Sequence, residues 1–472
     1  MLLRTSCATL LLWSAAFAQD DSVVRLKVET RVVQVAVAVK DVHGRPVRDL
    51  RKEDFTVLDE GRRRDIALFS TEAETAEAPV RPPSLPPNVY SNRFGANASR
   101  GRVTAILIDG VNTGWSLQSY ARGRAIEAVD RMAPGESIAL YTMTPNLAIL
   151  QDYTTDRALL RKALESYWPA VPTQTDRVPN RPGVMIPQLP RNPVANADMR
   201  RRVEDTLSYL RLIASHMAAA GGRKSIVWLT GGFPNFAEYS ELFNSTMRAI
   251  NDANVAIYPV DARGLLASSG AAINIRLMQR FAEQTGGQAY YNRNDVGEAI
   301  VEAVADSRYN YSLGFYLSDK DLDGRFHVLK VKVNRSGLVL HARNGYTAVS
   351  DPLETGRKKP RESPAAVLLT PIDSTGIGID ATADKLENGM LRVRVAIYPG
   401  APGEYTWSLV LLQTDARGLP VERTEVGLRL TLKYRQSANW EKAIPLRKDA
   451  TKLRLFLREI DTGRSGSLTV PL

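Results

Sequence analysis

Two aspartates stand at the ends of apolar runs, at positions where a carboxylate can take part in chemistry. Asp109 ends the run VTAILID, and Asp261 follows the run VAIYPV. Short runs of this kind are typical of strands buried on both faces of a parallel sheet, whose ligands sit beyond the carboxyl ends of the strands. Two carboxylates on that rim could carry acid–base hydrolysis if their pKa values are split. The alternative is that each one caps a helix or a turn.

The chain around these aspartates alternates in a way that predicts the fold. Residues 103–308 switch between apolar runs and amphipathic helical segments, which predicts an α/β domain with a doubly wound parallel sheet and an edge strand at 288–291. Residues 23–71 and 309–346 are rich in alternating valines, so we expect two β elements that pair with each other and flank the α/β domain. Residues 365–472 carry strand and turn signals throughout and predict a C-terminal β-sandwich.

Three segments lack a periodic apolar pattern and are predicted to connect these domains. Residues 72–102 are rich in proline and are expected to form a strap or linker lying on the next domain. Residues 347–364 contain a charged stretch and are interpreted as a second linker. A proline-rich insertion runs from Pro169 to Pro193 within the α/β domain.

Residues 1–18 have the features of a secretory signal peptide. Arg4 gives a positive start, Thr9 to Phe17 is mostly apolar, and the small-residue signal ends at Ala18. Removal of this segment also removes Cys7, so no disulfide or thiol chemistry is expected in the mature protein. No later segment has the length of a membrane-spanning helix. The sequence therefore predicts a secreted or periplasmic protein without a transmembrane segment after cleavage.

Charge and motif content exclude several function classes. The formal net charge is +11, or +10 once Arg4 is removed, and the basic residues are scattered without interleaved aromatics. This pattern argues against nucleic acid as a partner and favours a solvated surface over attraction to acidic surface polymers or phospholipid headgroups. The four histidines are far apart, and no HExxH or GxSxG motif occurs. The segment Gly221–Ser225 precedes a strand, so it is interpreted as a turn and not as a phosphate loop.

Several longer motifs carry a resemblance to a known family. They are LRKEDFTVLDEG, LPPNVYSNR, ILIDGVNT with YARGRAIEAV, LQDYTTDRALL, GRKSIVWLTGGFPN, YPVDARGL, GRFHVLKVKVNRSGLVLHARNGY and DTGRSGSLTVPL. In order and spacing they resemble the von Willebrand factor type A-related proteins abundant in Acidobacteria, over nearly the whole mature chain. The resemblance implies a von Willebrand factor A-like doubly wound sheet inserted between β elements, followed by the C-terminal β-sandwich.

The resemblance also implies a place for a metal ion. Type A domains often carry a metal-ion-dependent adhesion site, built from Asp-x-Ser-x-Ser after the first strand, a later Thr and an Asp after the fourth strand. In this sequence Asp109 matches the first aspartate, Thr113 matches the second serine, and Thr154 matches the later threonine. A shift of one residue would put Thr155 in place of Thr154.

Two of the five ligand positions are lost. Val111 stands at the first serine position and Gly231 at the final aspartate position, so neither offers a side-chain oxygen. Hard divalent cations need several oxygen ligands and carboxylate charge. We therefore expect no resident cofactor, and at most weak binding of Mg²⁺, Mn²⁺ or Ca²⁺. Without a metal, Asp109 would cap the following helix or tie loops together by hydrogen bonds.

The sequence thus favours a non-enzymatic, adhesion-type protein whose partner is a protein of the cell envelope or the extracellular space. The partner-binding rim is predicted to consist of Asp109, Asn112, Trp115, Phe233 and Asp261. The alternative is a cell-envelope hydrolase that uses the rim carboxylates Asp109 and Asp261, although no nucleophile or orienting base accompanies them.

Overall fold

A computed structural model gives the arrangement of most of the chain. It describes residues 31–71, 85–93, 103–144, 146–169, 193–218, 220, 222–233, 239–265, 271–306, 310–348, 372–399, 403–432, 437–460 and 464–472. The predicted signal peptide lies outside these residues, as do residues 170–192 of the proline-rich insertion and 349–364 of the second linker.

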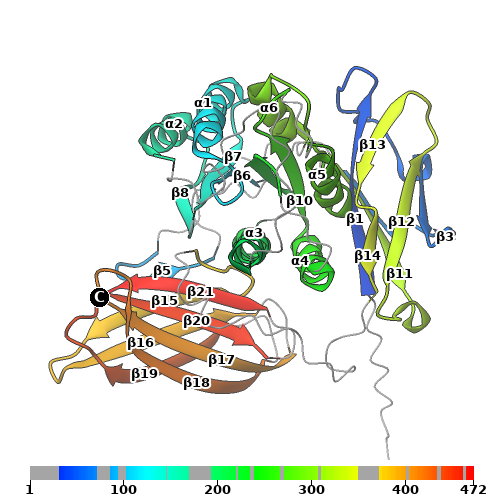
Figure 1. The fold of residues 1–472 in the computed structure, drawn as a ribbon. Helices are drawn as coiled ribbons and strands as arrows, with labels where there is room; N and C mark the ends of the chain where they lie inside the picture. The colour runs from blue at the N-terminus through cyan, green and yellow to red at the C-terminus, as the bar shows by residue number, and fades with distance from the viewer. Residues whose placement is uncertain are drawn as a thin grey trace, which may run out of the picture.

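The α/β unit is built on one twisted sheet with β6 at its centre (Figure 1). Its strands are β6 (Val103–Asp109), β7 (Ser137–Met143), β8 (Leu147–Thr154), β9 (Lys224–Thr230) and β10 (Val255–Asp261). They lie in the order β10-β9-β6-β7-β8, all parallel except β8, which runs antiparallel to β7. The chain starts at the centre, winds to one edge and then to the other, which is the doubly wound arrangement. The edge strand predicted at 288–291 is reduced to a single parallel bridge between Val260 and Tyr290.

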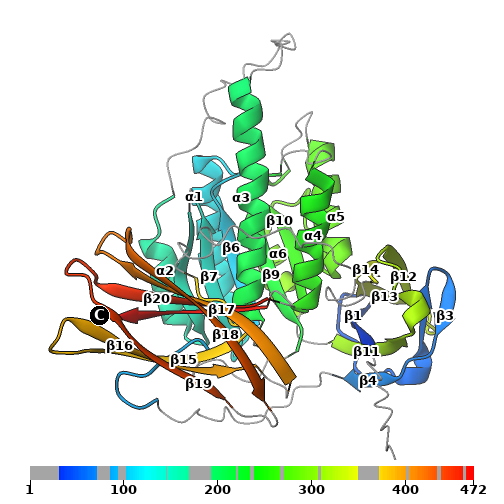
Figure 2. The ribbon, with the colours of Figure 1, turned by 90° about the horizontal axis from the view of Figure 1, so that it is seen from below.

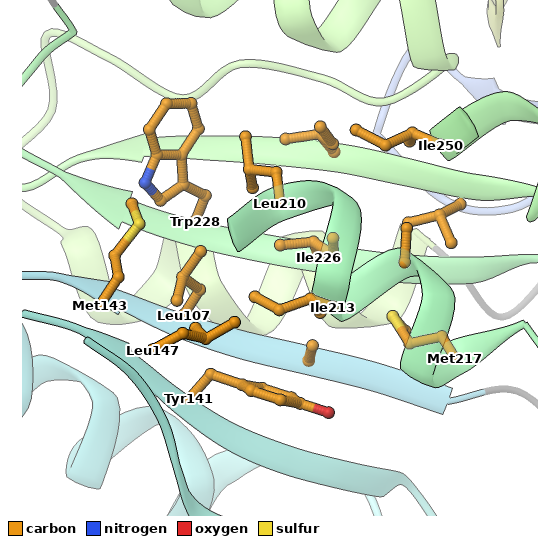
Figure 3. Close-up of a cluster of buried hydrophobic side chains, with 14 of the residues drawn as sticks. Leu107, Tyr141, Met143, Leu147, Leu210, Ile213, Met217, Ile226, Trp228 and Ile250 are labelled. Atoms are coloured by element: carbon orange, nitrogen blue, oxygen red, sulfur yellow. The ribbon is translucent and has the colours of Figure 1, made fainter. Parts of the chain in front are cut away.

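Helices cover both faces of this sheet. They are α1 (Trp115–Arg131), α2 (Arg157–Ser166), α3 (Pro193–Met217), α4 (Ser240–Asp252), α5 (Ala271–Thr285) and α6 (Val296–Asp306). Helices α1, α2 and α6 pack on one face, and α3 and α4 pack on the other together with Phe281 of α5. Strands β6, β7, β9 and β10 are buried at every position, which explains their continuous apolar sequences. Figure 3 shows Leu210, Ile213 and Met217 of α3 packed against side chains of these strands.

The N-terminal β unit combines strands from before and after the α/β unit. Its strands are β1 (Arg31–Asp41), β2 (Phe55–Asp59), β3 (Arg62–Arg64), β4 (Leu68–Thr71), β11 (Asn310–Leu317), β12 (Phe326–Val333), β13 (Leu338–Ala342) and β14 (Gly345–Thr347). They form two sheets, in the orders β13-β1-β11-β4 and β14-β12-β2-β3, and apolar side chains of both share one core. The α/β unit is therefore inserted between strands that pair with each other.

A buried polar contact joins the N-terminal β unit to the α/β unit. Lys40 of β1 lies 2.6 Å from Asp306 at the end of α6, and the Asp306 side chain is fully buried. Burial opposes ionisation of Asp306, but the Lys40 ammonium and the Arg223 guanidinium outweigh it and hold the pKa of this carboxyl below its ordinary value. Removing Lys40 would leave the buried Asp306 carboxylate with less compensating charge. The pair therefore favours this particular contact between the two units.

The C-terminal β unit follows, and it is antiparallel throughout its described strands. These are β15 (Gly378–Lys385), β16 (Met390–Tyr398), β17 (Gly403–Thr414), β18 (Pro420–Leu432), β19 (Ala438–Pro445), β20 (Lys452–Glu459) and β21 (Ser465–Pro471). They form two sheets whose facing side chains share an apolar core. In Figures 1 and 2 this unit lies beside α3. The contact includes the hydroxyls of Ser215 and Ser374, 2.6 Å apart, and the apolar packing of Leu212.

The predicted strap makes an unforeseen pairing. Tyr90 and Ser91 form the short strand β5, which pairs antiparallel with β15. This part of the strap is therefore an edge strand of the C-terminal β unit. The neighbouring Asn92 holds it there, because its side chain donates to the carbonyls of Ser374 and Ile377. In the described part of the chain, no helix is both long and apolar enough to cross a membrane.

Candidate functional site

Asp109 is at the carboxyl end of the central strand β6, and its carboxylate is enclosed by hydrogen-bond donors. The side chain is completely buried. Oδ1 accepts the backbone N–H groups of Val111 at 3.0 Å and Asn112 at 2.8 Å. Oδ2 accepts the Asn112 side-chain amide at 3.0 Å, the Trp228 indole at 3.1 Å and the Thr230 hydroxyl at 2.7 Å. Five donors thus converge on one carboxylate.

The sheet order explains why these groups meet. Strand β9 lies directly beside β6 and runs parallel to it, so Trp228 and Thr230 reach the same rim as Asp109. The loop after β6 turns sharply at Gly110, whose N–H donates to the carbonyl of Met143 on β7. A Cβ at Gly110 would lie 2.9 Å from that carbonyl oxygen, so the close approach requires glycine. This turn aims the following N–H groups back at the carboxylate.

Helix α3 adds a second layer to the site. The Asn112 amide also donates to the Thr206 hydroxyl at 2.9 Å, and the Asn112 oxygen accepts from the Arg202 guanidinium at 3.3 Å. Burial lowers the pKa of Arg202, and the nearby Asp109 charge opposes that fall. An arginine stays protonated under ordinary conditions. The positive charge of Arg202 therefore lies near the Asp109 carboxylate, and Asn112 is hydrogen-bonded to both side chains.

This donor set does not fit a divalent cation. A carboxylate has about four lone-pair positions, and the five donors already use them. Val111, Asn112 and Trp228 present N–H groups, which repel a cation. Burial raises the pKa of Asp109, and the hydrogen bonds from Thr230, Asn112 and Trp228 oppose that rise. The geometry describes a carboxylate that holds two strands and a loop together, and it leaves no open oxygen for a metal.

The other two predicted metal ligands are not directed at Asp109. The Thr113 hydroxyl is buried and accepts the Gly231 N–H at 2.7 Å, so it ties the β6 and β9 loops together. Thr154 pairs with Ile138, five residues before Met143. It therefore lies roughly 16 Å from the rim, near the amino-terminal ends of the parallel strands. Its hydroxyl accepts the Asp156 N–H at 3.1 Å. The expectation for Thr154, and for Thr155 beyond it, is corrected because β8 runs antiparallel.

The predicted rim residues differ greatly in exposure. Trp115 begins α1 and is 48% exposed, and Asn112 is half-buried in the Asp109 network. Phe233 is only 3% exposed, because its ring packs edge-on against Trp228 and Phe281. Asp109 is also inaccessible, so neither Phe233 nor Asp109 can contact a partner directly in this structure.

The two rim carboxylates lie on strands that are separated by β9. Asp109 and Asp261 align with Thr230 from either side, so two strand spacings separate their Cα atoms by roughly 10 Å. Asp261 is nearly buried and accepts both Nε and Nη2 of Arg263, at 2.8 and 2.7 Å. Asp109 is completely buried and Asp261 nearly so, and each carboxylate is hydrogen-bonded by its own neighbours.

Sequence reasoning missed the groups that close the site. Thr206 and Arg202 come from α3, and Trp228 and Thr230 come from β9, all more than ninety residues from Asp109. One signal was visible for Thr206, because this polar residue interrupts the apolar stripe of α3 between Val203 and Leu210. A polar residue on a buried helical stripe needs a partner.

We expect the chain without the predicted signal peptide (residues 1–18) to show no micromolar affinity for Mg²⁺, Mn²⁺ or Ca²⁺, because a cation would have to displace buried N–H donors. Isothermal titration calorimetry measures this directly, with the Asp109→Ala variant as the control. A micromolar affinity that disappears in that variant would contradict the geometry of the site.

Comparisons with known proteins were made for the whole chain. No known family profile matches it, and no curated protein matches it. Solved structures that resemble it include an aerotolerance-related membrane protein from Bacteroides fragilis, with 13% sequence identity and a TM-score of 0.28. The alignment covers 43% of this chain and 99% of that chain. A von Willebrand factor type A protein from Catenulispora acidiphila has 12% sequence identity and a TM-score of 0.30, and the alignment covers 86% of this chain and 74% of that chain. The pilus adhesin SpaC from Lactobacillus rhamnosus GG has 9% identity, 86% and 57% coverage and a TM-score of 0.29.

Proposed function

We propose that this chain is an exported, non-enzymatic binding protein whose α/β unit presents its rim to a protein of the cell envelope or the extracellular space. In this proposal the crevice at Asp109 is a degenerate, metal-free form of an adhesion site. The observation that carries the proposal is the closed Asp109 network, which organises the rim loops but offers no group for catalysis or for a cation. Export rests on the signal peptide predicted for residues 1–18.

The contact surface is proposed to be a group of exposed apolar side chains in the first turns of α1 and in the turn after β10. We define the rim patch as Trp115, Tyr120 and Leu265, which are 48%, 37% and 60% exposed. Asn294 links α1 to the segment of Leu265, because its carbonyl accepts from the Tyr120 hydroxyl and its side chain accepts from the Leu265 N–H, both at 3.2 Å. Exposed aromatic and aliphatic side chains on a supported surface are typical anchors of protein interfaces.

The double variant Trp115→Ala/Leu265→Ser is expected to lose the proteins that the mature wild-type chain retains from an envelope extract. Removing two apolar anchors typically weakens an interface by about 2 kcal/mol or more each when they are hot spots. The matched control is Leu419→Ser/Ile460→Ser, which removes two similarly exposed apolar residues from the C-terminal β unit. Quantitative mass spectrometry of the retained proteins compares the three chains. Identical retention by all three would argue against binding through the rim patch.

The hydrolase interpretation is less well supported. It would need a carboxylate that exchanges protons with solvent, whereas Asp261 is held by Arg263 and Asp109 by its five donors. We therefore propose binding, and not catalysis, as the function of this rim.

A further inference from the structure

The sheet β14-β12-β2-β3 has a second face that the proposed function does not use. In Figure 1 it lies on the side of the N-terminal β unit that is turned away from the α/β unit. The inner face of this sheet carries Phe55, Val57 and Leu329 in the shared core. Because side chains alternate along a strand, the residues between them point outward. Along β12 these outward positions are exposed, while β14 at the edge of the sheet approaches α4 of the α/β unit.

One end of this outer face is apolar. Phe326 and Val328 of β12 are 48% and 55% exposed. The Phe326 ring lies over Gly345 of β14, where a Cβ would meet the ring, so the ring lies close to the plane of the sheet. The carboxylate of Glu60 also lies at this end and accepts the Val328 N–H. The apolar end is thus ordered by its neighbours and remains open to solvent.

The other end of the same face is basic. Lys330 and Lys332 continue the outward positions of β12, and Leu58 of β2 lies between Lys330 and Arg63 of β3 in the register. Both lysines and Arg63 are exposed. No carboxylate of the described residues pairs with these three cations. Phe326 and Lys330 are separated by roughly 13 Å along the strand.

We propose that this outer face, defined by Phe326, Val328, Leu58, Lys330, Lys332 and Arg63, docks on the surface of an anionic phospholipid bilayer. The apolar end would enter the boundary between headgroups and acyl chains, which extends over about 5–10 Å. The three cations would then lie at the level of the phosphates, where each basic residue adds attraction. A bilayer surface offers an apolar layer for Phe326 and Val328 and phosphates for the three cations, so it accounts for both ends of the face.

The test is co-sedimentation of the mature chain with vesicles of phosphatidylcholine, with and without phosphatidylglycerol. We expect binding only with phosphatidylglycerol, weakening as salt is raised. The variant Lys330→Glu/Lys332→Glu is expected to lower the partition coefficient by roughly tenfold or more. Phe326→Ser is expected to lower it several-fold, and thermal unfolding by circular dichroism checks that each variant is folded.

The matched control is Lys442→Glu/Lys448→Glu, which makes the same change of net charge at exposed lysines of the C-terminal β unit. It should bind the vesicles like the wild type. An equal loss in this control would overturn the proposal, since diffuse positive charge would then be responsible. Equal binding to both kinds of vesicle would also overturn it. Retention on polyglutamate beads but not on vesicles, lost in Lys330→Glu/Lys332→Glu, would assign the face to an acidic protein and overturn the lipid proposal.

Discussion

Replacement of Asp109 by alanine is expected to lower the free energy of unfolding of the α/β unit by about 3–5 kcal/mol, because it orphans several buried donors at once. The Trp228 indole and the Thr230 hydroxyl are fully buried beside it. A methyl group cannot replace the acceptor that Oδ2 provides to the Trp228 indole at 3.1 Å. The Thr230 hydroxyl, 2.7 Å from Oδ2, also lies 2.7 Å from the Gly232 carbonyl and can donate there. Urea denaturation measures the loss, and hydrogen exchange at the β6 and β9 amides assigns it to this unit.

Two further variants sharpen this expectation. Asp109→Asn keeps one acceptor oxygen but turns an amide N–H₂ toward the existing donors, so we expect a smaller loss of the same sign. Asp130→Ala removes an exposed aspartate that pairs with Arg161, and it should leave the free energy of unfolding nearly unchanged. If Asp109 were instead a metal ligand awaiting its ion, Asp109→Ala in chelator would be neutral or stabilising. That outcome would rule out the structural role.

The main features of the α/β unit could be predicted from sequence because its strands are fully buried. Continuous apolar runs such as Val103–Asp109 indicate strands that are buried on both faces. Parallel strands joined by helices can adopt few topologies. The apolar pattern of an edge strand does not indicate whether it runs parallel or antiparallel to its neighbour. Strand β8 follows β7 after a short connection and runs antiparallel, which removes Thr154 from the rim.

The rest of the site could not be predicted, because its contacts depend on distant parts of the chain. Phe233 appeared to be a rim residue because it follows a strand by three positions. The chain turns back at Gly232, which has φ +140°, and this turn places the Phe233 ring on Trp228. The pairing of Tyr90 and Ser91 with β15 likewise joins segments nearly three hundred residues apart. Local pattern alone cannot select such a partner.

The joint between α3 and the C-terminal β unit is expected to make the protein sensitive to acid through His216. This histidine is buried at the end of α3, and its ring is edge-on to Tyr141 and Tyr153. Burial lowers its pKa below the ordinary value of 6.5, although Asp152, 3.7 Å away, and Asp373 oppose that fall. The nearby Arg454 guanidinium lowers the pKa further.

The sign of the effect follows from proton binding. Below about pH 6.5 the unfolded chain protonates His216 while the folded chain does not, so stability falls as the pH drops toward the folded pKa. The loss approaches about 1.4 kcal/mol per pH unit for one proton. Asp373 acts in the opposite direction, because burial raises its pKa and the folded chain protonates first, between the ordinary value of 3.8 and its raised value. The readout must therefore be the difference between variants.

His216→Phe is expected to flatten the decline of the free energy of unfolding between pH 6.5 and 5, because phenylalanine keeps the ring packing and cannot take a proton. His43→Gln is the matched control, since His43 is exposed in a turn of the N-terminal β unit and its replacement should leave the decline unchanged. Urea denaturation across this pH range compares both with the wild type. Parallel declines in wild type and His216→Phe would show that His216 does not bring about the acid sensitivity. The backbone carbonyl of His216 accepts from the Thr375 hydroxyl at 2.7 Å, so this histidine lies at the contact between the two units. Proteolysis in acid should therefore first cleave the chain beside this joint in the wild type, and not in His216→Phe.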